Sequence, residues 1–374
     1  MHNAILIGTA IPQISYTYTA FVSSGAVASG ELNNISKPYS NMDDAANALL
    51  TAYPGSTPIS GDPSGAVRIA LLTNISGSLS AGLTDNLGLR GVLIESVGGV
   101  HTLNQILLNH NNDGGASSII LKNITVQTMQ LTNSDDTLHF EAPYIYGITG
   151  VTIQNLIGNG SNGSNGADGA YGGTSTGADA SQDPPMSSCP PQNGANGEGA
   201  NADGGDGLGA GNGGWGYNIH LMGNGTVSYV ELKGGTGGAG GNGGSGGTAI
   251  GGAGQPGGSS NCEYDQDGGI GGNGGSASAN AGNGGNGGTG GDGGSVMYEA
   301  GWTITTYDLS NGEGGGAGGA GASGSVFPGG GNVGGSGSGT GSTGATGADG
   351  TGSANSGLPG NNGGNGSPGN LVPI

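Results

Sequence analysis

The segment GVTIQNL at 150–156 recurs, with the same alternation of apolar and polar residues, as GTVSYVEL at 225–232 and GWTITTYDL at 301–309. The three copies therefore follow one another at a nearly constant spacing. Each copy follows another short strand-like run and precedes a glycine tract, and IILKNITVQTMQL at 119–131 has the same two-strand shape without a tract. A repeat unit this short cannot bury its apolar face alone and needs neighbours to cover it. The pattern therefore predicts an all-β fold of stacked solenoid rungs.

Glycine is distributed very unevenly between the two parts of the chain. Residues 1–157 hold 16 of the 94 glycines, and residues 158–374 hold the other 78. In the second part glycine recurs at every third position, as at 160, 163, 166 and 169. A period of three matches a polyproline-II-type helix, which has three residues per turn and a rise of about 3.1 Å per residue. Strict triplets argue against flexible linkers, so we predict three long glycine-rich excursions packed as a polyglycine-II helix bundle.

The spacing of glycine predicts which excursion lies at the centre of the bundle. The second arm begins GGTGGAGGNGGSGG at 234–247, whereas the first arm has one glycine in three. A helix of three residues per turn has three edges along its length. Two edges that carry only glycine let neighbouring backbones approach closely on both, whereas a single glycine edge allows close approach on one side only. We therefore expect the second arm to be central and the first peripheral. Each arm is expected to turn at a stretch of different composition: Gln182–Gln192, Gln255–Asp267 and Ser325–Asn332, the last near Val326-Phe327-Pro328.

Three regions are expected along the chain. Residues 1–66 are interpreted as N-terminal strands and one short helix that form an attachment segment or cap, with Ser40 or Asn41 capping a helix that ends near Pro54. Residues 67–157 are interpreted as β-solenoid rungs without long helices between them. Residues 158–374 are interpreted as glycine-rich arms interleaved with two further rungs, at about 216–233 and 295–310.

The net charge of the chain limits the classes of partner that it is expected to bind. Only 5 basic residues stand against 25 acidic ones, which gives a net charge of −20. Binding of phosphate backbones requires clustered Lys and Arg, so nucleic acid is not an expected partner. No run of about 18 apolar residues is present, so we expect no membrane insertion. The opening MHNAILIG lacks the basic n-region and long apolar core of a secretory signal. The expected extracellular or virion location therefore implies that a signal was removed or that export used another route, such as release of a virion by lysis.

The triplet tracts and their non-glycine tips resemble the glycine-rich receptor-binding adhesins of T-even-type phage long tail fibres and, more distantly, mycobacterial glycine-rich repeat surface proteins. The resemblance covers roughly residues 158–370 and is one of pattern. It implies a rigid polyglycine-II bundle whose tip loops bind a cell-surface receptor or glycan. The region 1–157 and the interleaved rungs instead resemble a pectate-lyase-like right-handed β-helix. Self-association or contact with a fibre protein is expected through the N-terminal region.

Two sets of residues are candidates at the tips. The two cysteines, Cys189 and Cys262, fall in the tips of different arms, and an even pair in an apparently extracellular chain predicts a disulfide that joins them. Exposed aromatic and polar tip residues can form a receptor-binding surface, although packing of the tip turns against one another explains them equally well. The receptor-binding candidates are Pro184, Met186, Tyr264, Asp265, Asp267 and Phe327.

No enzyme is predicted. Asp113, Asp135, Asp136 and Glu141 are the acids that a β-helix glycosidase would need to pair, but acids in such contexts are more often turn formers. The five histidines have no metal-ligand spacing, so no metal site or cofactor is predicted; Ca²⁺ stays open because Asp and Asn oxygens are abundant. The expected function is a non-catalytic structural and adhesive protein of a virion or cell surface. The alternatives are a subunit of an extracellular filament or sheath and, third, a polysaccharide-degrading β-helix enzyme.

Overall fold

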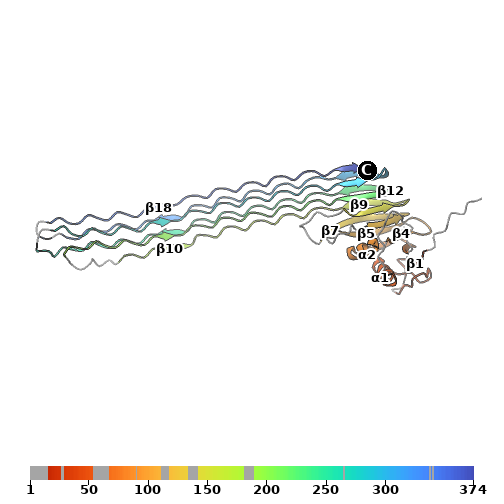
Figure 1. Ribbon diagram of the computed structural model, residues 1–374, viewed down its shortest axis with the longest axis horizontal. Helices are drawn as coiled ribbons and strands as arrows, with labels where there is room; N and C mark the ends of the chain where they lie inside the picture. The colour runs from red at the N-terminus through yellow and green to blue at the C-terminus, as the bar shows by residue number, and fades with distance from the viewer. Residues whose placement is uncertain are drawn as a thin grey trace, which may run out of the picture.

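The chain folds into a stack of parallel strands from which a long rod projects (Figure 1). The computed structural model describes residues 16–26, 29–53, 67–89, 91–110, 118–133, 142–180, 189–263, 266–336, 338 and 341–374. The strands stack from β1 at one end to β19 at the other, and the rod leaves the side of the stack (Figure 1). The predicted all-β solenoid with projecting glycine-rich arms is confirmed.

Two parallel ladders form the solenoid. The first ladder runs through β1 (Tyr18–Val22), β2 (Val67–Leu71), β4 (Leu93–Ser96), β6 (Ser118–Lys122), β8 (Tyr144–Gly147), the start of β12 (Ile219–Glu231), β15 (Val296–Tyr298) and β19 (Leu371–Pro373). The second runs through β3 (Ile75–Leu79), β5 (His101–His110), β7 (Ile124–Asn133), β9 (Thr152–Ile157), the end of β12 and β16 (Gly301–Asp308). The segments quoted first above supply β9, the end of β12 and β16.

Columns of apolar side chains hold successive rungs in register. Residues that pair from rung to rung in the second ladder form two such columns, Leu103–Val126–Ile153–Val227–Ile304 and Ile106–Met129–Leu156–Val230–Tyr307. All but the last member of each column are fully buried. Complete burial of one such side chain contributes about 1.5–3 kcal/mol. The core therefore depends on stacking along the solenoid and not on any single rung.

Two helices cover the first end of the solenoid. The helix α1 (Met42–Ala52) begins at Asn41, whose side chain accepts a hydrogen bond from the Asp44 N–H at 2.8 Å, as predicted. The helix α2 (Ala81–Leu89) was not predicted, because its sequence AGLTDNLGL contains two glycines and no clear helical period. It forms where it packs against α1, β5 and β6, so tertiary contacts outweigh its weak local preference.

The rod consists of six extended legs in two layers of three. The outgoing legs are 158–180, 233–258 and 310–336, and the returning legs are 193–216, 268–294 and 341–370. Neighbours within a layer are parallel, as shown by the hydrogen bonds from Gly163 N to Thr236 O and from Gly237 N to Glu313 O, at 2.8 and 2.9 Å. Neighbours in opposite layers are antiparallel and also bond through the backbone. Legs without internal hydrogen bonds thus satisfy their amides between neighbours.

The second arm lies at the centre of the rod, as predicted. The leg 233–258 exchanges backbone hydrogen bonds with four other legs, and so does 268–294, whereas 158–180 bonds to only two. A central leg contacts neighbours on several sides, so it needs glycine, which has no side chain, on more than one of its edges. A Cβ atom added to Gly241 would lie 1.9 Å from the Ala167 carbonyl oxygen, so only glycine fits there.

The glycine triplets are interrupted halfway along the rod. Two three-stranded patches form there: β10 (Thr174–Thr176), β13 (Thr248–Ile250) and β17 (Ser325–Phe327) in one layer, and β11 (Ala200–Asn201), β14 (Ala277–Ser278) and β18 (Gly352–Ser353) in the other. Between them lies a small core of Ala200, Ala202, Ala249, Ala277 and Ala279, against which Val326 packs. The prediction that the third arm turns at Ser325–Asn332 is therefore wrong. The arm continues outward through Ser336, and Ser338 pairs with Gln266 near the end of the rod.

Candidate binding surface at the tip of the rod

A disulfide joins the first two arms at the far end of the rod. Cys189 and Cys262 are bonded, with their Cα atoms 5.1 Å apart, and close a loop with a sequence separation of 73. The predicted bridge is confirmed. Disulfides persist in oxidising compartments, so the bridge is consistent with an extracellular location.

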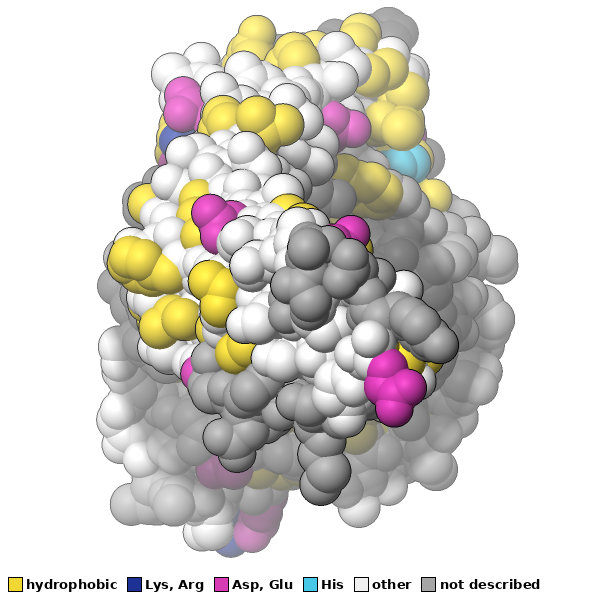
Figure 2. All heavy atoms as spheres, turned by 90° about the vertical axis from the view of Figure 1, so that its left-hand side faces the viewer, with side chains coloured by type: hydrophobic (Ala, Val, Ile, Leu, Met, Phe, Trp, Pro, Cys, Tyr) yellow, Lys and Arg dark blue, Asp and Glu magenta, His cyan; other side chains and the backbone are white. Residues whose placement is uncertain are grey.

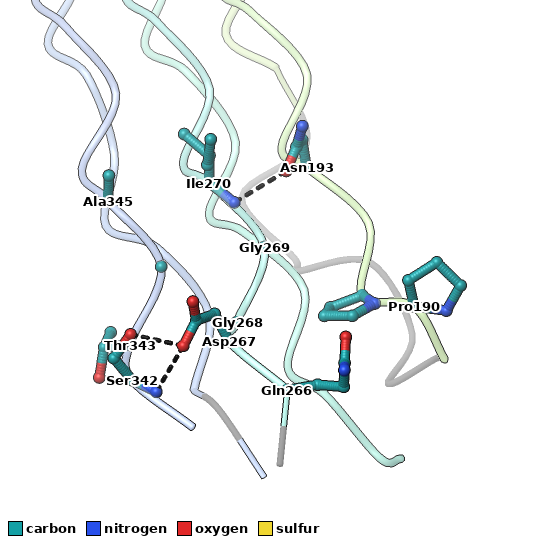
Figure 3. Close-up of a pocket in the computed structure, with 12 residues that line it drawn as sticks. Pro190, Asn193, Gln266, Asp267, Gly268, Gly269, Ile270, Ser342, Thr343 and Ala345 are labelled. Carbon is teal, nitrogen blue, oxygen red and sulfur yellow. Dashed lines mark hydrogen bonds between the residues drawn. The ribbon is translucent and has the colours of Figure 1, made fainter. Parts of the chain in front are cut away.

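Next to the disulfide lies a groove of about 720 Å³ that all three arms line. Asn193 comes from the first arm, Gln266, Asp267 and Ile270 from the second, and 342–345 from the third (Figure 3). Because no single arm builds this surface, its shape depends on the packing of the rod.

Hydrogen bonds between arms fix the floor of the groove. The Asn193 side-chain oxygen accepts from the Ile270 N–H at 2.9 Å. One carboxylate oxygen of Asp267 accepts from both the backbone N–H and the hydroxyl of Ser342, at 2.8 and 2.6 Å (Figure 3). These bonds tie the second arm to its neighbours on both sides, so the groove exists before any ligand binds.

The described lining of the groove is polar and includes one acidic side chain, Asp267. The hydroxyl of Ser342, followed by its backbone N–H, lowers the pKa of Asp267, because hydrogen bonds to the charged form favour it. No Lys, Arg or His is among the lining residues that the structure describes. Ile270 is 49% exposed, and it and Pro190 contribute apolar groups to the lining. The described surface therefore offers hydrogen-bond acceptors, amides and a small apolar area.

The sequence-predicted tip residues have different outcomes. Pro184, Met186, Tyr264 and Asp265 lie outside the described residues. Asp267 lines the groove, as a tip residue should. Phe327 does not lie at the tip: it ends β17 halfway along the rod, where it pairs with Ile250 and is 56% exposed.

Sequence reasoning missed several residues that line the groove. The missed residues are Asn193, Gln266, Ile270, Ser342 and Thr343. Gln266 lies inside the predicted tip Gln255–Asp267 but was not among the receptor-binding candidates. The other four fall where glycine triplets resume after a tip, and Asn193 occupies a non-glycine triplet position that bonds to the neighbouring leg. Composition alone did not separate them from the rest of the arms.

In the described part of the chain, no three His, Cys, Asp or Glu side chains lie close enough together to hold a metal ion. The acids weighed for glycoside hydrolysis, Asp113, Asp135, Asp136 and Glu141, fall outside the described residues. Neither described helix, of 11 and 9 residues, has the length and hydrophobicity that crossing a bilayer requires.

Comparisons with known proteins leave the family open. No protein-family model and no curated protein matches the chain. Among solved structures it is similar to the nine polyproline type II helical bundle springtail antifreeze protein from Granisotoma rainieri, with 28% identity over 48% of this chain and 94% of that one. The TM-score is 0.10, so the two folds do not superpose and the similarity says nothing about the role of the rod here.

Proposed function

We propose that the protein is a non-catalytic adhesive module that presents the tip of its rod to a cell-surface receptor or glycan. The observation that carries this proposal is the groove built from three arms and braced by the Cys189–Cys262 disulfide. The arms turn at the end of the rod that lies far from the solenoid (Figure 1), and the groove borders the disulfide that joins the first two arms there. Contact at a distance explains why so much of the chain forms a long, narrow projection.

The rod would make binding efficient by holding the tip in one conformation. Its legs are joined by backbone hydrogen bonds over their whole length. A preorganised surface loses less conformational freedom on binding than a flexible loop does. The solenoid and the N-terminal region would then attach the module to a fibre protein or surface, as in the tail-fibre adhesins that the sequence resembles.

The chemistry of the groove favours an uncharged ligand. Asp267, Gln266 and Asn193 can accept or donate hydrogen bonds, and Ile270 with Pro190 can contact an apolar ring face. With no basic side chain in the described lining of the groove and a net charge of −20, the protein would disfavour an anionic ligand. A neutral saccharide or a polar protein loop fits these properties.

Substitution of one tip residue tests the proposal. Ile270→Arg places a large charged side chain in the groove, and Ile250→Arg is the matched control, because Ile250 is 39% exposed but lies halfway along the rod. We expect purified wild-type protein and the Ile250 variant to bind susceptible cells or an array of neutral glycans equally, and the Ile270 variant to bind at least about tenfold more weakly. Equal binding by both variants would contradict the proposal.

A structural subunit of a filament is the second candidate, and one observation favours it. Ile250 and Phe327 form an exposed apolar pair on the flat side of the rod, where rods could pack side by side. The same two variants separate the candidates. Loss of assembly with Ile250→Arg, while Ile270→Arg assembles normally, would favour the filament.

A further inference from the structure

The two ends of the solenoid differ in whether other segments of the described chain cover the terminal strand. At the first end, the outer edge of β1 is occupied by its own chain: Tyr39 N donates to Phe21 O at 2.7 Å, Ser23 N to Tyr39 O at 3.0 Å, and Asn33 N to Thr19 O at 2.7 Å. The helix α1 packs over the same end. These contacts form a cap, which solenoids need to protect their terminal rungs.

The last end has no such cap within the described residues. There, β16 pairs only with β12, and β19 pairs only with β15. The strand β16 is 8 residues long, and five of its residues are exposed: Gly301, Thr303, Thr305, Thr306 and Tyr307. A long edge strand with unpaired backbone groups is a template for pairing with another chain.

The last residues of the apolar columns are also at least partly exposed to solvent at this end of the solenoid. Val230 is fully buried, but Tyr307, the next member of its column, is 58% exposed because no described rung lies above it. Val372 and Ile374 add exposures of 38% and 60% at the same end. Hydrophobic side chains gather along the top of Figure 2, which corresponds to the β19 end of the stack in Figure 1.

The strand β16 itself carries no unpaired charge, and Glu299, in the turn before it, accepts a hydrogen bond from the Gly223 N–H. The one charged residue of β16, Asp308, forms an ion pair with Lys233 at 2.9 Å. Two molecules that each carry a net charge of −20 repel each other over most of their surfaces. They can approach most closely where charge is paired and side chains are apolar or hydroxylic, which describes the strand β16.

We infer that a second copy of this chain docks on the open end, with the two β16 edges paired antiparallel about a two-fold axis between Ile304 and Thr305. In this register Thr303 lies opposite the partner's Thr306, and Gly301 lies opposite the partner's Asp308, so no like charges meet. The capped first end prevents further stacking, so assembly stops at a dimer. Because the third outgoing leg leaves from the end of β16, the two rods point in opposite directions.

Light scattering after gel filtration and negative-stain electron microscopy of the full chain test this inference. We expect a concentration-dependent dimer below about 100 µM, with one rod projecting from each side of a central body. A wild-type monomer at that concentration, including one that instead binds a strand of another protein, would overturn it. So would a dimer whose rods lie side by side.

Matched variants test the surface itself. Tyr307→Glu would bury a charge near the two-fold axis and weaken dimerisation at least about tenfold, whereas Tyr171→Glu, at a tyrosine 66% exposed on the first outgoing leg, would leave it unchanged. If the Tyr307 variant does not fold, Thr305→Lys introduces an edge-blocking charge at an exposed position. If a folded Tyr307→Glu or Thr305→Lys variant dimerised as strongly as the wild-type protein, that result would overturn the inference.

Discussion

The side-chain oxygen of Asn165 accepts a hydrogen bond at 2.9 Å from the backbone N–H of Ala239, 74 residues further along the chain. This bond belongs to a ladder in which side chains of the first outgoing leg all bond at the same offset: Asn159, Asn162, Asn165, Asp168 and Asp179. Returning legs repeat the arrangement at offsets of 77 and 75. Backbone bonds between legs leave some amides pointing outward, and Asn or Asp on the neighbouring leg satisfies them. The ladder also fixes the register of one leg against the next.

Removal of one rung of this ladder should have a modest, local cost. Asn165→Ala deletes the acceptor of the Ala239 amide, which then bonds to water, and we expect a loss of about 0.5–1.5 kcal/mol in the free energy of unfolding. Faster hydrogen exchange at Ala239, measured by NMR, would locate the effect. Asn165→Asp keeps the oxygen and should protect the amide. Equal exchange in the two variants would show that the ladder does not hold the legs.

The same regular offset explains which parts of the rod the sequence predicted and which it did not. Rungs were predictable because their β-branched segments recur at a nearly constant spacing, and the order of the arms followed from bare glycine edges. The third tip was misplaced because Val326-Phe327-Pro328 departs from glycine in composition, as a tip does. Val326 pairs with Ala249, which is itself paired with Ser175. The nearly constant offset between arms would therefore have placed Val326 beside these residues of the other two arms and not at a tip.

Local sequence could not reveal features that only packing creates. The helix α2 forms against β5 and β6, and the binding groove forms where three arms converge. The disulfide was predictable because only two cysteines exist and both lie in tips. Ile270 and Thr343, by contrast, became neighbours of the groove only through the folding of separate arms.

Two glycines of the rod should respond oppositely to alanine. An added Cβ at Gly241 would lie 1.9 Å from the Ala167 carbonyl oxygen, so Gly241→Ala must push two legs apart and should cost about 1–3 kcal/mol or more. Gly316 has nothing within 4 Å of an added Cβ, and Gly316→Ala should stabilise the rod by about 0.4–1 kcal/mol by restricting the unfolded chain. Urea unfolding of both variants measures the difference. Similar losses at the two sites would mean that glycine serves flexibility and not close packing.

A buried carboxylate joins three rungs of the solenoid. Glu95 is only 5% exposed and pairs with Arg68 and, at 3.1 Å, with Lys122. Glu95→Ala leaves two cations without their partner, and we expect a loss of about 3–5 kcal/mol in the free energy of unfolding. Glu31→Ala, which breaks the solvent-exposed pair with Lys37, is the control and should change stability little. If thermal unfolding shifts equally in both variants, burial does not determine the importance of this network.

Reduction of the disulfide should loosen the tip without unfolding the rod. The closed loop of about 73 residues corresponds to about 4 kcal/mol in the chain-entropy model. Cys189→Ser with Cys262→Ser should therefore lower the free energy of unfolding by up to that amount and increase proteolysis near the tip. Receptor binding should weaken as well, because the groove borders the bridge. A double variant with unchanged proteolysis and stability would show that packing of the arms alone fixes the tip.

The junction between rod and solenoid should make the protein sensitive to acid. The hydrogen bond from Lys233 lowers the pKa of Asp308, and hydrogen bonds from Asn159 and then Tyr229 lower the pKa of Glu231. A carboxyl group whose pKa falls on folding stabilises the protein at pH values above its unfolded pKa of about 4, and this contribution is lost as pH falls through the folded pKa. The melting temperature should thus be level near neutrality and drop below about pH 4.

A variant of the shared lysine separates this junction from other acidic groups. Lys233→Met removes the partner of Asp308 and should lower the melting temperature at pH 7, and this difference should shrink as pH falls below about 4 and the carboxyl is protonated. The bond to Asp308 also raises the pKa of Lys233, so the wild-type advantage should persist below about pH 10 and disappear as pH rises through the folded pKa. Scanning calorimetry from pH 3 to 11 measures both limits. A constant difference between wild type and variant at every pH would mean that the lysine acts through its aliphatic packing and not through its charge.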